Sequence, residues 1–331
     1  MKAWMIRAGR GGVYAADWLE RDIIGIGWDF GGADISAIGR EEIRAAYVSA
    51  HPAESKQKVA SSVGQVDRFA HSMVEGSTVV MYDPAERLYH IGVVDGPCLP
   101  VQEPEAITYT RAVSWSGTAA RDALSQSSKN SLGGIQTIFA ITDEVMADLM
   151  AAADASPSSP VGPTDDQAND SSSDDEVLTA TFDNGIELIK DRVSQLNWED
   201  MERLVAGMLK AMGYCARVTP KGPDGGRDVI ASPDPLGLES PRIVAEVKHR
   251  KGAMGAPAVR SFIGGLRAGD RGLYVSTGGF TKDARLEADR ATVPVRLLDL
   301  DAFVCHYVEV YDAADDETRN ILPLTRIWWP A

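Results

Sequence analysis

KGPDGGRDVIASPDPLGLESPRIVAEVK, residues 221–248, contains two short runs that are typical of β-strands. The first run, Asp228–Ala231, follows a Gly-rich turn. The second, Arg242–Lys248, follows a loop rich in Pro, Gly and Ser. Strand-forming runs separated by turn residues predict a hairpin. We therefore expect Asp228 to lie beside the second strand.

Three side chains of this hairpin suit one kind of chemistry. Glu246 and Lys248 are two residues apart, so on a strand they project from the same face. The carboxylates of Asp228 and Glu246 are hard oxygen ligands of the kind that Mg²⁺ prefers. The Lys248 ammonium can orient a water molecule or stabilise charge on a phosphate. The pattern predicts metal-assisted hydrolysis of a phosphodiester.

Each of these motifs also has an ordinary structural interpretation. An Asp after Gly-Gly-Arg is commonly a turn residue, and Glu-x-Lys on a strand commonly forms a solvated face. However, Val244, Ala245 and Val247 indicate that this strand is buried on at least one side. Buried charges need partners or a metal ion. The combination, in this order, favours the catalytic interpretation.

The spacing from Asp228 to Glu246-x-Lys248 resembles that of the PD-(D/E)xK nuclease superfamily. A longer pattern, covering roughly Leu196–Val308, resembles the Mrr-type restriction endonuclease catalytic domain. It consists of Asn197–Glu202, Gly213-Tyr214, Gly222–Asp228, Thr277–Thr281 and Leu297–Asp299. One position differs from the Mrr pattern: many Mrr-like members have Gln where this chain has Glu246. Glu is the commoner residue at this position in the wider superfamily.

The resemblance implies a Mg²⁺-dependent deoxyribonuclease acting on double-stranded DNA. Asp228, Glu246 and Lys248 would be its catalytic residues, with the two carboxylates as metal ligands. In similar nucleases an acidic residue of the first helix also reaches the metal, which here corresponds to Glu202; its ordinary interpretation is a glutamate at the edge of an apolar helix stripe. The implied fold is a central mixed sheet flanked by helices.

Further polar residues near this motif are candidates for contacts to the DNA backbone, because clustered cations next to a cleavage site suit phosphates. They are Lys221, Arg227, His249, Arg250, Lys251 and Thr277. A solvated turn is the alternative for the cations, and a simple Gly-Gly turn is the alternative for the segment that begins at Thr277.

The formal net charge of −15 would by itself argue against a nucleic-acid partner. The distribution of this charge along the chain removes that objection. Residues 143–176 contain ten Asp or Glu and no Lys or Arg. Residues 217–290 contain thirteen Lys or Arg against nine Asp or Glu, a local excess of four positive charges. Because DNA binding depends on the local field, the catalytic region remains compatible with DNA.

We expect two domains joined by a linker. Residues 1–148 form an α+β domain, residues 149–177 a flexible acidic linker, and residues 178–331 the nuclease domain. The segment from Ala155 to Asp175 has almost no large apolar residues, so it cannot offset its ordering entropy by burial. The fold class expected for the whole chain is therefore α/β with two domains.

Local patterns predict the elements of both domains. In the N-terminal domain we expect strands over Met5-Ile6, Ile23–Ile26, Thr78–Tyr82, Tyr89–Val94 and Ile135–Ile141, with helices over Arg40–Ser49 and Glu54–Ala70. In the C-terminal domain, helices are expected over Asp183–Leu196, Trp198–Met212, Pro257–Arg267, Thr281–Ala291 and Asp301–Val310, and further strands over Gly272–Ser276 and Val295–Leu298.

The aromatic residues of the N-terminal domain resemble in their layout the PUA-like group of domains, including EVE and YTH domains, which hold a modified base in an aromatic cage. The candidate base-binding residues are Trp4, Trp28, Asp34, Ser36 and Trp115. The alternative is that the tryptophans are ordinary core residues. A domain that flips and reads a base would give a backbone-cutting nuclease its target.

Together these patterns predict a modification-dependent, type IV-like restriction endonuclease of anti-phage defence. Two alternatives remain open: an anti-phage or repair nuclease that senses another ligand, and a non-catalytic DNA-binding module. Cutting both strands needs two active sites, and a two-fold homodimer is the simplest source of them. Cys98, Cys215 and Cys305 show neither zinc nor disulfide spacing, which predicts a cytoplasmic protein. The sequence has no apolar run long enough to span a membrane and no apolar segment near the N-terminus. We therefore expect neither a membrane span nor a signal peptide.

Overall fold

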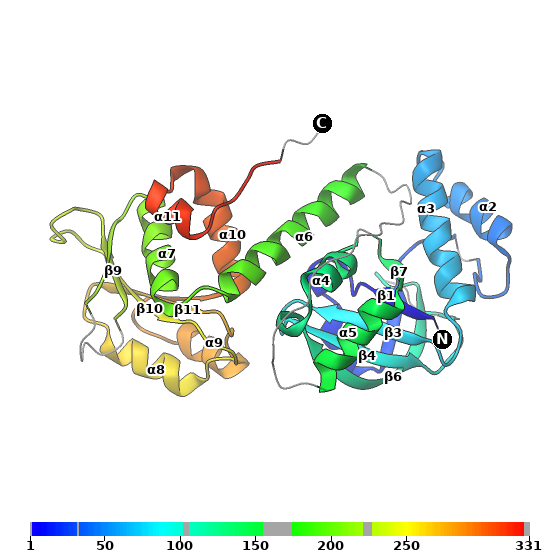
Figure 1. The fold of residues 1–331 in the computed structure, drawn as a ribbon, viewed down its shortest axis with the longest axis horizontal. Helices are drawn as coiled ribbons and strands as arrows, with labels where there is room; N and C mark the ends of the chain where they lie inside the picture. The colour runs from blue at the N-terminus through cyan, green and yellow to red at the C-terminus, as the bar shows by residue number, and fades with distance from the viewer. Residues whose placement is uncertain are drawn as a thin grey trace. The chain divides into compact units, whose positions relative to one another are not determined.

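The structure is a computed structural model that describes residues 2–31, 33–101, 106–134, 136–154, 174–220 and 227–327. The chain divides into two compact units, unit 1 (residues 1–184) and unit 2 (residues 185–331), as Figure 1 shows. Each unit is built around its own sheet.

Unit 1 contains a seven-stranded sheet within the described ranges, with the strand order β2-β6-β4-β3-β1-β7 and β5 paired to β6. Its strands are β1 (Ala3–Ile6), β2 (Ile23–Ile26), β3 (Thr78–Asp83), β4 (Leu88–Val94), β5 (Leu99–Pro100), β6 (Tyr109–Ala120) and β7 (Ile138–Ile141). β1 and β3 are parallel, whereas the other pairs are antiparallel.

Helices cover both faces of this sheet. They are α1 (Ala15–Glu20), α2 (Arg40–Ala50), α3 (Lys56–Asp67), α4 (Gln126–Leu132) and α5 (Asp143–Asp154). Trp18, Tyr47 and Val63 of α1–α3 pack in one core cluster, which contains Trp4 of β1. Leu132 and Leu149 of α4 and α5 belong to a second cluster with Met5, the neighbour of Trp4. The alternation along β1 thus separates the two cores.

Among its described residues, unit 2 contains a five-stranded mixed sheet in the order β12-β11-β10-β9-β8. Its strands are β8 (Cys215–Val218), β9 (Val229–Ser232), β10 (Arg242–Lys248), β11 (Asp270–Ser276) and β12 (Val295–Asp299). β8, β9 and β10 form an antiparallel meander, and β10, β11 and β12 run parallel. β10 is therefore the central strand, with the hairpin on one side and the parallel crossover on the other.

The helices of unit 2 are α7 (Trp198–Ala211), α8 (Ala256–Gly265), α9 (Lys282–Asp289), α10 (Leu300–Val310) and α11 (Asp316–Ile321), while α6 (Asp174–Ser194) begins in unit 1 and continues into unit 2. α7 and α10 pack on the sheet face of Ala245 and Val247. α8 and α9 pack on the opposite face, which carries Val244 and Tyr274 (Figure 1).

Local sequence explains where these helices begin and end. Asn197 caps α7, because its side chain accepts a hydrogen bond of 2.8 Å from the Asp200 N–H. Gly213 follows the helix with a φ of 94°, a left-handed conformation that suits glycine. Thr281 and Asp299 cap α9 and α10 in the same way as Asn197 caps α7.

The predicted mixed α/β architecture and most of the predicted elements are confirmed. The linker prediction is wrong at both ends, because residues 149–154 belong to α5 and residues 174–177 to α6. Its remaining part, residues 155–173, lies outside the described residues. The sequence analysis also missed β6, a twelve-residue strand that pairs with β2 and β4.

Candidate active site

Asp228 stands directly before β9 and is held by main-chain bonds on both sides. Its N–H donates to the Ala245 carbonyl at 2.9 Å, and its carbonyl accepts from the Thr219 N–H at 2.9 Å. Its side-chain Oδ2 accepts from the Val247 N–H at 2.6 Å. The carboxylate therefore lies against the main chain of β10, between Glu246 and Lys248.

Glu246 and Lys248 project from the same face of β10, as their spacing predicts. They form an ion pair, with 2.9 Å between Lys248 Nζ and Glu246 Oε1. The Glu246 side chain is 11% exposed, whereas that of Lys248 is 35% exposed. The Lys248 side chain is therefore more accessible to solvent than that of Glu246.

The environment of Glu246 disfavours its charge. Burial raises the pKa of this carboxyl, and the neighbouring Asp228 carboxylate raises it further. The ion pair with Lys248 and a hydrogen bond from Tyr274 act in the opposite direction, but the net pKa remains above the ordinary value. Two neighbouring carboxylates, one of them buried, form a place where added positive charge is favourable.

Two polar residues of β11 lie beside this group and were missed by the sequence analysis. In the parallel register Tyr274 pairs with Glu246, and Ser276 pairs with Lys248. The spacing of the two hydroxyls matches that of Glu246 and Lys248. It becomes informative only once the register of β10 and β11 is known.

Helix α7, which carries Glu202, packs on the sheet face of Ala245 and Val247, opposite the face from which Glu246 and Lys248 project. Glu202 itself is half-buried. Within the described ranges, no group of three or more His, Cys, Asp or Glu side chains is placed to hold a metal ion. Of the predicted acidic residues, Asp228 and Glu246 lie together beside β10, whereas Glu202 belongs to the helix on the opposite face.

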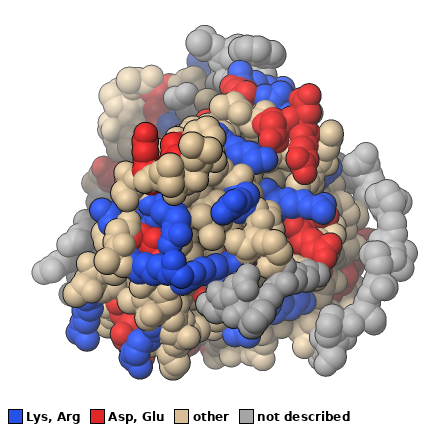
Figure 2. Space-filling model, turned by 90° about the vertical axis from the view of Figure 1, so that its left-hand side faces the viewer, with Lys and Arg blue, Asp and Glu red and all other residues tan. Residues whose placement is uncertain are grey.

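The candidate backbone-contacting residues differ in their exposure and in their contacts. Arg250 and Lys251 are exposed. Arg227 is half-exposed and donates to the Gly265 carbonyl at 2.8 Å. Lys221 lies outside the described residues. Figure 2 shows Lys and Arg side chains spread across the face of unit 2 that it presents.

Thr277 and His249 have structural bonds in this arrangement. Thr277 Oγ1 accepts from the Arg250 N–H at 3.1 Å, which ties the loop after β10 to the end of β11. The Nε2 atom of His249 lies 2.7 Å from the carbonyl oxygen of Leu196. Gly278 permits the close approach of these loops, since a Cβ there would lie 2.3 Å from the Gly252 carbonyl oxygen.

Comparison with known families assigns this region. Residues 193–305 match the family model described as "Restriction endonuclease". Over these residues unit 2 is similar to a restriction endonuclease domain of the Mrr type. Residues 4–142 match a separate family described only as a domain of unknown function.

Two curated proteins are similar to parts of the chain. One is an uncharacterized protein of Sinorhizobium fredii, 33% identical over 98 residues, which cover 28% of this chain and 25% of that protein. The other is the type IV methyl-directed restriction enzyme EcoKMrr of Escherichia coli K12, 30% identical over 119 residues, which cover 34% of this chain and 38% of the enzyme. The chain thus matches less than two fifths of the length of either relative.

Two solved structures are also similar. The MspJI restriction endonuclease in complex with a 27-mer oligonucleotide has 13% identity and a TM-score of 0.31, covering 74% of this chain and 64% of that one. The DNA modification-dependent restriction endonuclease AspBHI has 15% identity and a TM-score of 0.32, covering 91% of this chain and 78% of that one.

The candidate base-binding residues of unit 1 do not form one cluster. Some lie in a loop and the others lie on the sheet. Trp28, Asp34 and Ser36 lie in the loop that follows β2. Thr108 Oγ1 donates to the Trp28 carbonyl at 2.8 Å, and the Tyr109 hydroxyl donates to the Ala33 carbonyl, so this loop is fastened to the start of β6. Trp28 is half-buried.

Trp4 and Trp115 lie instead on the sheet. Trp4 is only 3% exposed, so a base cannot stack on it in this arrangement, which corrects the prediction for that residue. Trp115 is half-buried, and its ring lies over Gly92, where a Cβ would be 2.9 Å from the ring. Of the three candidate tryptophans, Trp28 is therefore the one that lies in a loop.

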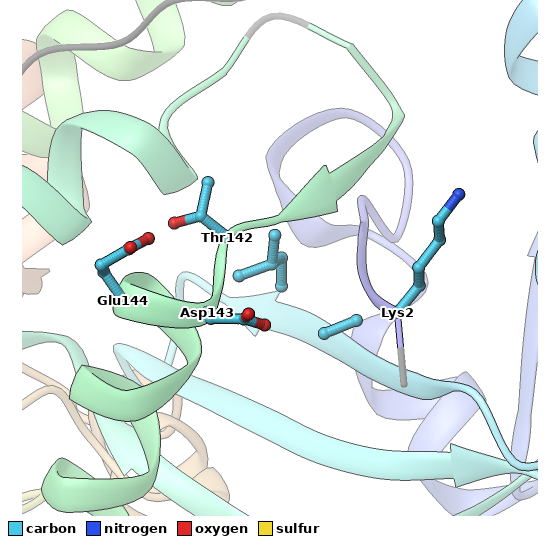
Figure 3. A pocket seen from close by; sticks show the side chains of 6 residues that line it. Lys2, Thr142, Asp143 and Glu144 are labelled. Carbon is cyan, nitrogen blue, oxygen red and sulfur yellow. The ribbon is translucent and has the colours of Figure 1, made fainter.

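A shallow hollow of about 620 Å³ near the start of α5 has polar lining but does not form a site. Figure 3 shows that the Lys2 ammonium points away from the carboxylates of Asp143 and Glu144. Thr142 Oγ1 accepts from the Val145 N–H at 3.4 Å, as an N-terminal helix cap does. These residues serve the beginning of the helix.

No helix in the described ranges is both long and apolar enough to cross a membrane.

Proposed function

We propose that the chain is a modification-dependent DNA endonuclease whose unit 2 hydrolyses phosphodiester bonds with Mg²⁺. The observation that carries this proposal is the group formed by Asp228, Glu246 and Lys248. The two carboxylates lie together at the end of the hairpin, and the ammonium is 2.9 Å from Glu246 Oε1. The Mrr-type family match of the same residues supports it.

The donor set fits Mg²⁺. This cation is usually bound in such enzymes by one or two carboxylates together with water and substrate phosphates. Asp228 and Glu246 would provide those two carboxylates. Burial and mutual repulsion already raise the pKa of Glu246, and a bound cation would relieve both effects. When bound, the metal would lower the pKa of a water ligand and neutralise charge on the phosphate.

The other functional groups of the site suit the remaining tasks. Lys248 would hold the attacking water or stabilise the negative charge that develops on the phosphate as the bond to the leaving sugar oxygen breaks. Its ammonium is partly exposed, so it can meet a substrate. The exposed Arg250 and Lys251, with the half-exposed Arg227, would bind adjacent phosphates of the DNA backbone.

Unit 1 would select the target by reading a modified base. Trp28, in the fastened loop with Asp34 and Ser36, offers an aromatic surface beside polar groups. Stacking a base on an aromatic ring is worth about 1–3 kcal/mol. That gain would offset much of the few kcal/mol needed to flip a base out of the duplex.

Cleavage of three plasmids tests the proposal. The full chain is incubated with unmodified, cytosine-methylated and hydroxymethylated DNA of the same sequence, with Mg²⁺ or with a chelator. We expect cleavage only with Mg²⁺ and preferentially of a modified plasmid. Absence of cleavage of all three with Mg²⁺ or Mn²⁺ would contradict the nuclease assignment. Equal cleavage of all three would leave the nuclease in place and reject the base-reading role.

Binding measurements separate the reader from the cutter. The full-length Asp228→Asn variant should bind a modified duplex more tightly than the plain duplex at matched salt. Adding Trp28→Ala should remove most of that preference while circular dichroism shows an intact fold. A preference that survives Trp28→Ala would place the reading site elsewhere in unit 1.

A further inference from the structure

The parallel pairing of β10 with β11 places a hydroxyl beside each proposed catalytic side chain of β10. Tyr274 is the register partner of Glu246, and Ser276 is the register partner of Lys248. Paired residues of neighbouring strands project from the same face of a sheet. We propose that Tyr274 and Ser276 are positioning residues, Tyr274 for the Glu246 carboxylate and Ser276 for the Lys248 side chain. This inference rests on the proposed nuclease function.

Tyr274 is fixed in place by aromatic packing. It is fully buried, and its ring lies 5.1 Å from that of Phe262 and 5.5 Å from that of Phe280, measured between centroids. Its hydroxyl lies close enough to the Glu246 carboxylate to lower the pKa of that carboxyl. A donor that cannot move fixes the orientation of the carboxylate that it binds.

The phenol hydroxyl of Tyr274 is not needed to fill the core. A Phe would pack between Phe262 and Phe280 equally well, and a buried hydroxyl costs free energy unless it has a partner. The hydroxyl therefore serves the carboxylate, as the partners of metal-binding carboxylates commonly do.

The Ser276 hydroxyl, in contrast to that of Tyr274, has no hydrogen-bond partner among the described residues. Its Oγ is fully buried. Its register partner on the other side is Asp299 of β12. That carboxylate is already engaged, by the Ala302 N–H at 3.0 Å and by Arg285 at 2.8 Å.

Lys248 is the remaining register partner of Ser276. An ammonium has three donors, and in this structure one of them meets Glu246. When Glu246 binds a cation, its oxygen becomes less available to Lys248. The Ser276 hydroxyl then offers a buried acceptor that keeps the Lys248 side chain at the site.

Three variants test this arrangement in the full chain: Tyr274→Phe, Ser276→Ala and the control Tyr307→Phe. Tyr307 is also fully buried, but it belongs to α10 on the other sheet face, with its hydroxyl 3.4 Å from the Thr318 carbonyl. The measurements are thermal stability, DNA affinity without divalent metal, and single-turnover cleavage as a function of Mg²⁺ concentration.

For Tyr274→Phe we expect about a 10–100-fold loss in metal affinity or cleavage rate, as found for other residues that support metal ligands. DNA affinity should stay within about twofold, because the phenol would contact no phosphate. Tyr307→Phe should leave both the Mg²⁺ dependence and the rate unchanged. A Mg²⁺ dependence and rate for Tyr274→Phe equal to those of Tyr307→Phe would overturn the role of Tyr274.

For Ser276→Ala we expect unchanged or higher thermal stability, because the substitution removes a buried hydroxyl that has no partner. The cleavage rate should nevertheless fall several-fold, and Ser276→Thr, which keeps the hydroxyl, should recover most of it. Lower stability with an unchanged rate would show that Ser276 is only structural.

Manganese binding distinguishes a failure of this inference from a failure of the proposed function. Mn²⁺ affinity is measured by calorimetry for the wild type and for Tyr274→Phe, without DNA. Weaker binding by the variant supports the positioning role even if the wild type cuts none of the DNAs. Equal binding by both proteins overturns it even if the wild type is an active nuclease.

Discussion

Each unit of the protein buries a charged side chain on a strand, but the two are held differently. In unit 1, Arg111 of β6 is 4% exposed, and its guanidinium donates to the carbonyls of Phe69, Ala70 and Gly96 at 2.8 Å each. In unit 2, Glu246 of β10 is 9% exposed and retains a raised pKa despite Lys248 and Tyr274.

The difference separates a charge that main-chain groups hold from the charge that we propose to be functional. Each of the three Arg111 nitrogens donates to a main-chain carbonyl, so the side chain ties β6 to the segments of Phe69-Ala70 and Gly96. Glu246 keeps an unfavourable charge beside a second carboxylate, an arrangement that costs stability unless a cation is added. Burial lowers the pKa of Arg111 just as it raises the pKa of Glu246, so the two residues differ in their partners and not in whether burial disfavours their charge.

The largest expected effect is the loss of cleavage on removal of the ammonium. Lys248→Ala should reduce single-turnover cleavage by at least about 10²–10³-fold, the range for loss of one preorganised charge that stabilises a transition state. DNA affinity should change little. Lys210→Ala is the control, since Lys210 is an exposed cation of unit 2 that pairs with Asp315. Equal rates for the two variants would reject the catalytic role of Lys248.

The next effect concerns stability in unit 1. Arg111→Met should lower the unfolding free energy of this unit by about 2–4 kcal/mol, because three buried carbonyls lose their donor. Urea unfolding followed by tryptophan fluorescence measures the change. The exposed Arg21, which pairs with Asp17, provides the control Arg21→Met, with an expected change below about 0.5 kcal/mol. A similar small change for Arg111→Met would contradict its structural role.

The smallest effect is a gain in stability at the active site. Because the folded-state pKa of Glu246 is raised, its contribution to stability is full below the ordinary pKa of 4.5 and is lost as the pH rises through the raised value. Glu246→Gln removes the charge, so at pH 7.5 we expect a gain of about 1 kcal/mol, or about 2–4 °C in melting temperature.

That gain should shrink as the pH falls toward 4.5, and thermal scans of both proteins across this range would measure it. Mg²⁺ should raise the melting temperature of the wild type more than that of Glu246→Gln, since a ligand stabilises only the state that binds it. A lower melting temperature for Glu246→Gln at pH 7.5 would show that the ionised carboxylate stabilises the fold.

The sequence predicted the positions of the three candidate residues relative to one another, because these positions depend on local structure. Asp228 stands at the start of one strand of a hairpin, and Glu246 and Lys248 share a face of the other, so turn residues and alternation were sufficient. The roles of Tyr274 and Ser276 depend on a parallel register that follows a helical crossover through α8, and no local pattern specifies that register.

The fold was predictable to a similar degree. The apolar stripe of α7 and the Val-rich strands were identified from their periodicity. β6 was missed because Ser114, Ser116 and Gly117 interrupt its apolar pattern, although the strand is stabilised by pairing on both sides. The linker prediction rested on the scarcity of large apolar residues in Ala155–Asp175, but its boundary was placed at residue 149, before the end of the helix Asp143–Asp154.

The most direct test of the account is to locate a metal ion. Crystals of the full chain are soaked in Mn²⁺, a substitute for Mg²⁺, and the anomalous signal of manganese is measured. We predict a peak about 2 Å from an oxygen of Asp228 and of Glu246. A well-occupied manganese peak elsewhere in unit 2, with none between these two carboxylates, would contradict the proposed active site.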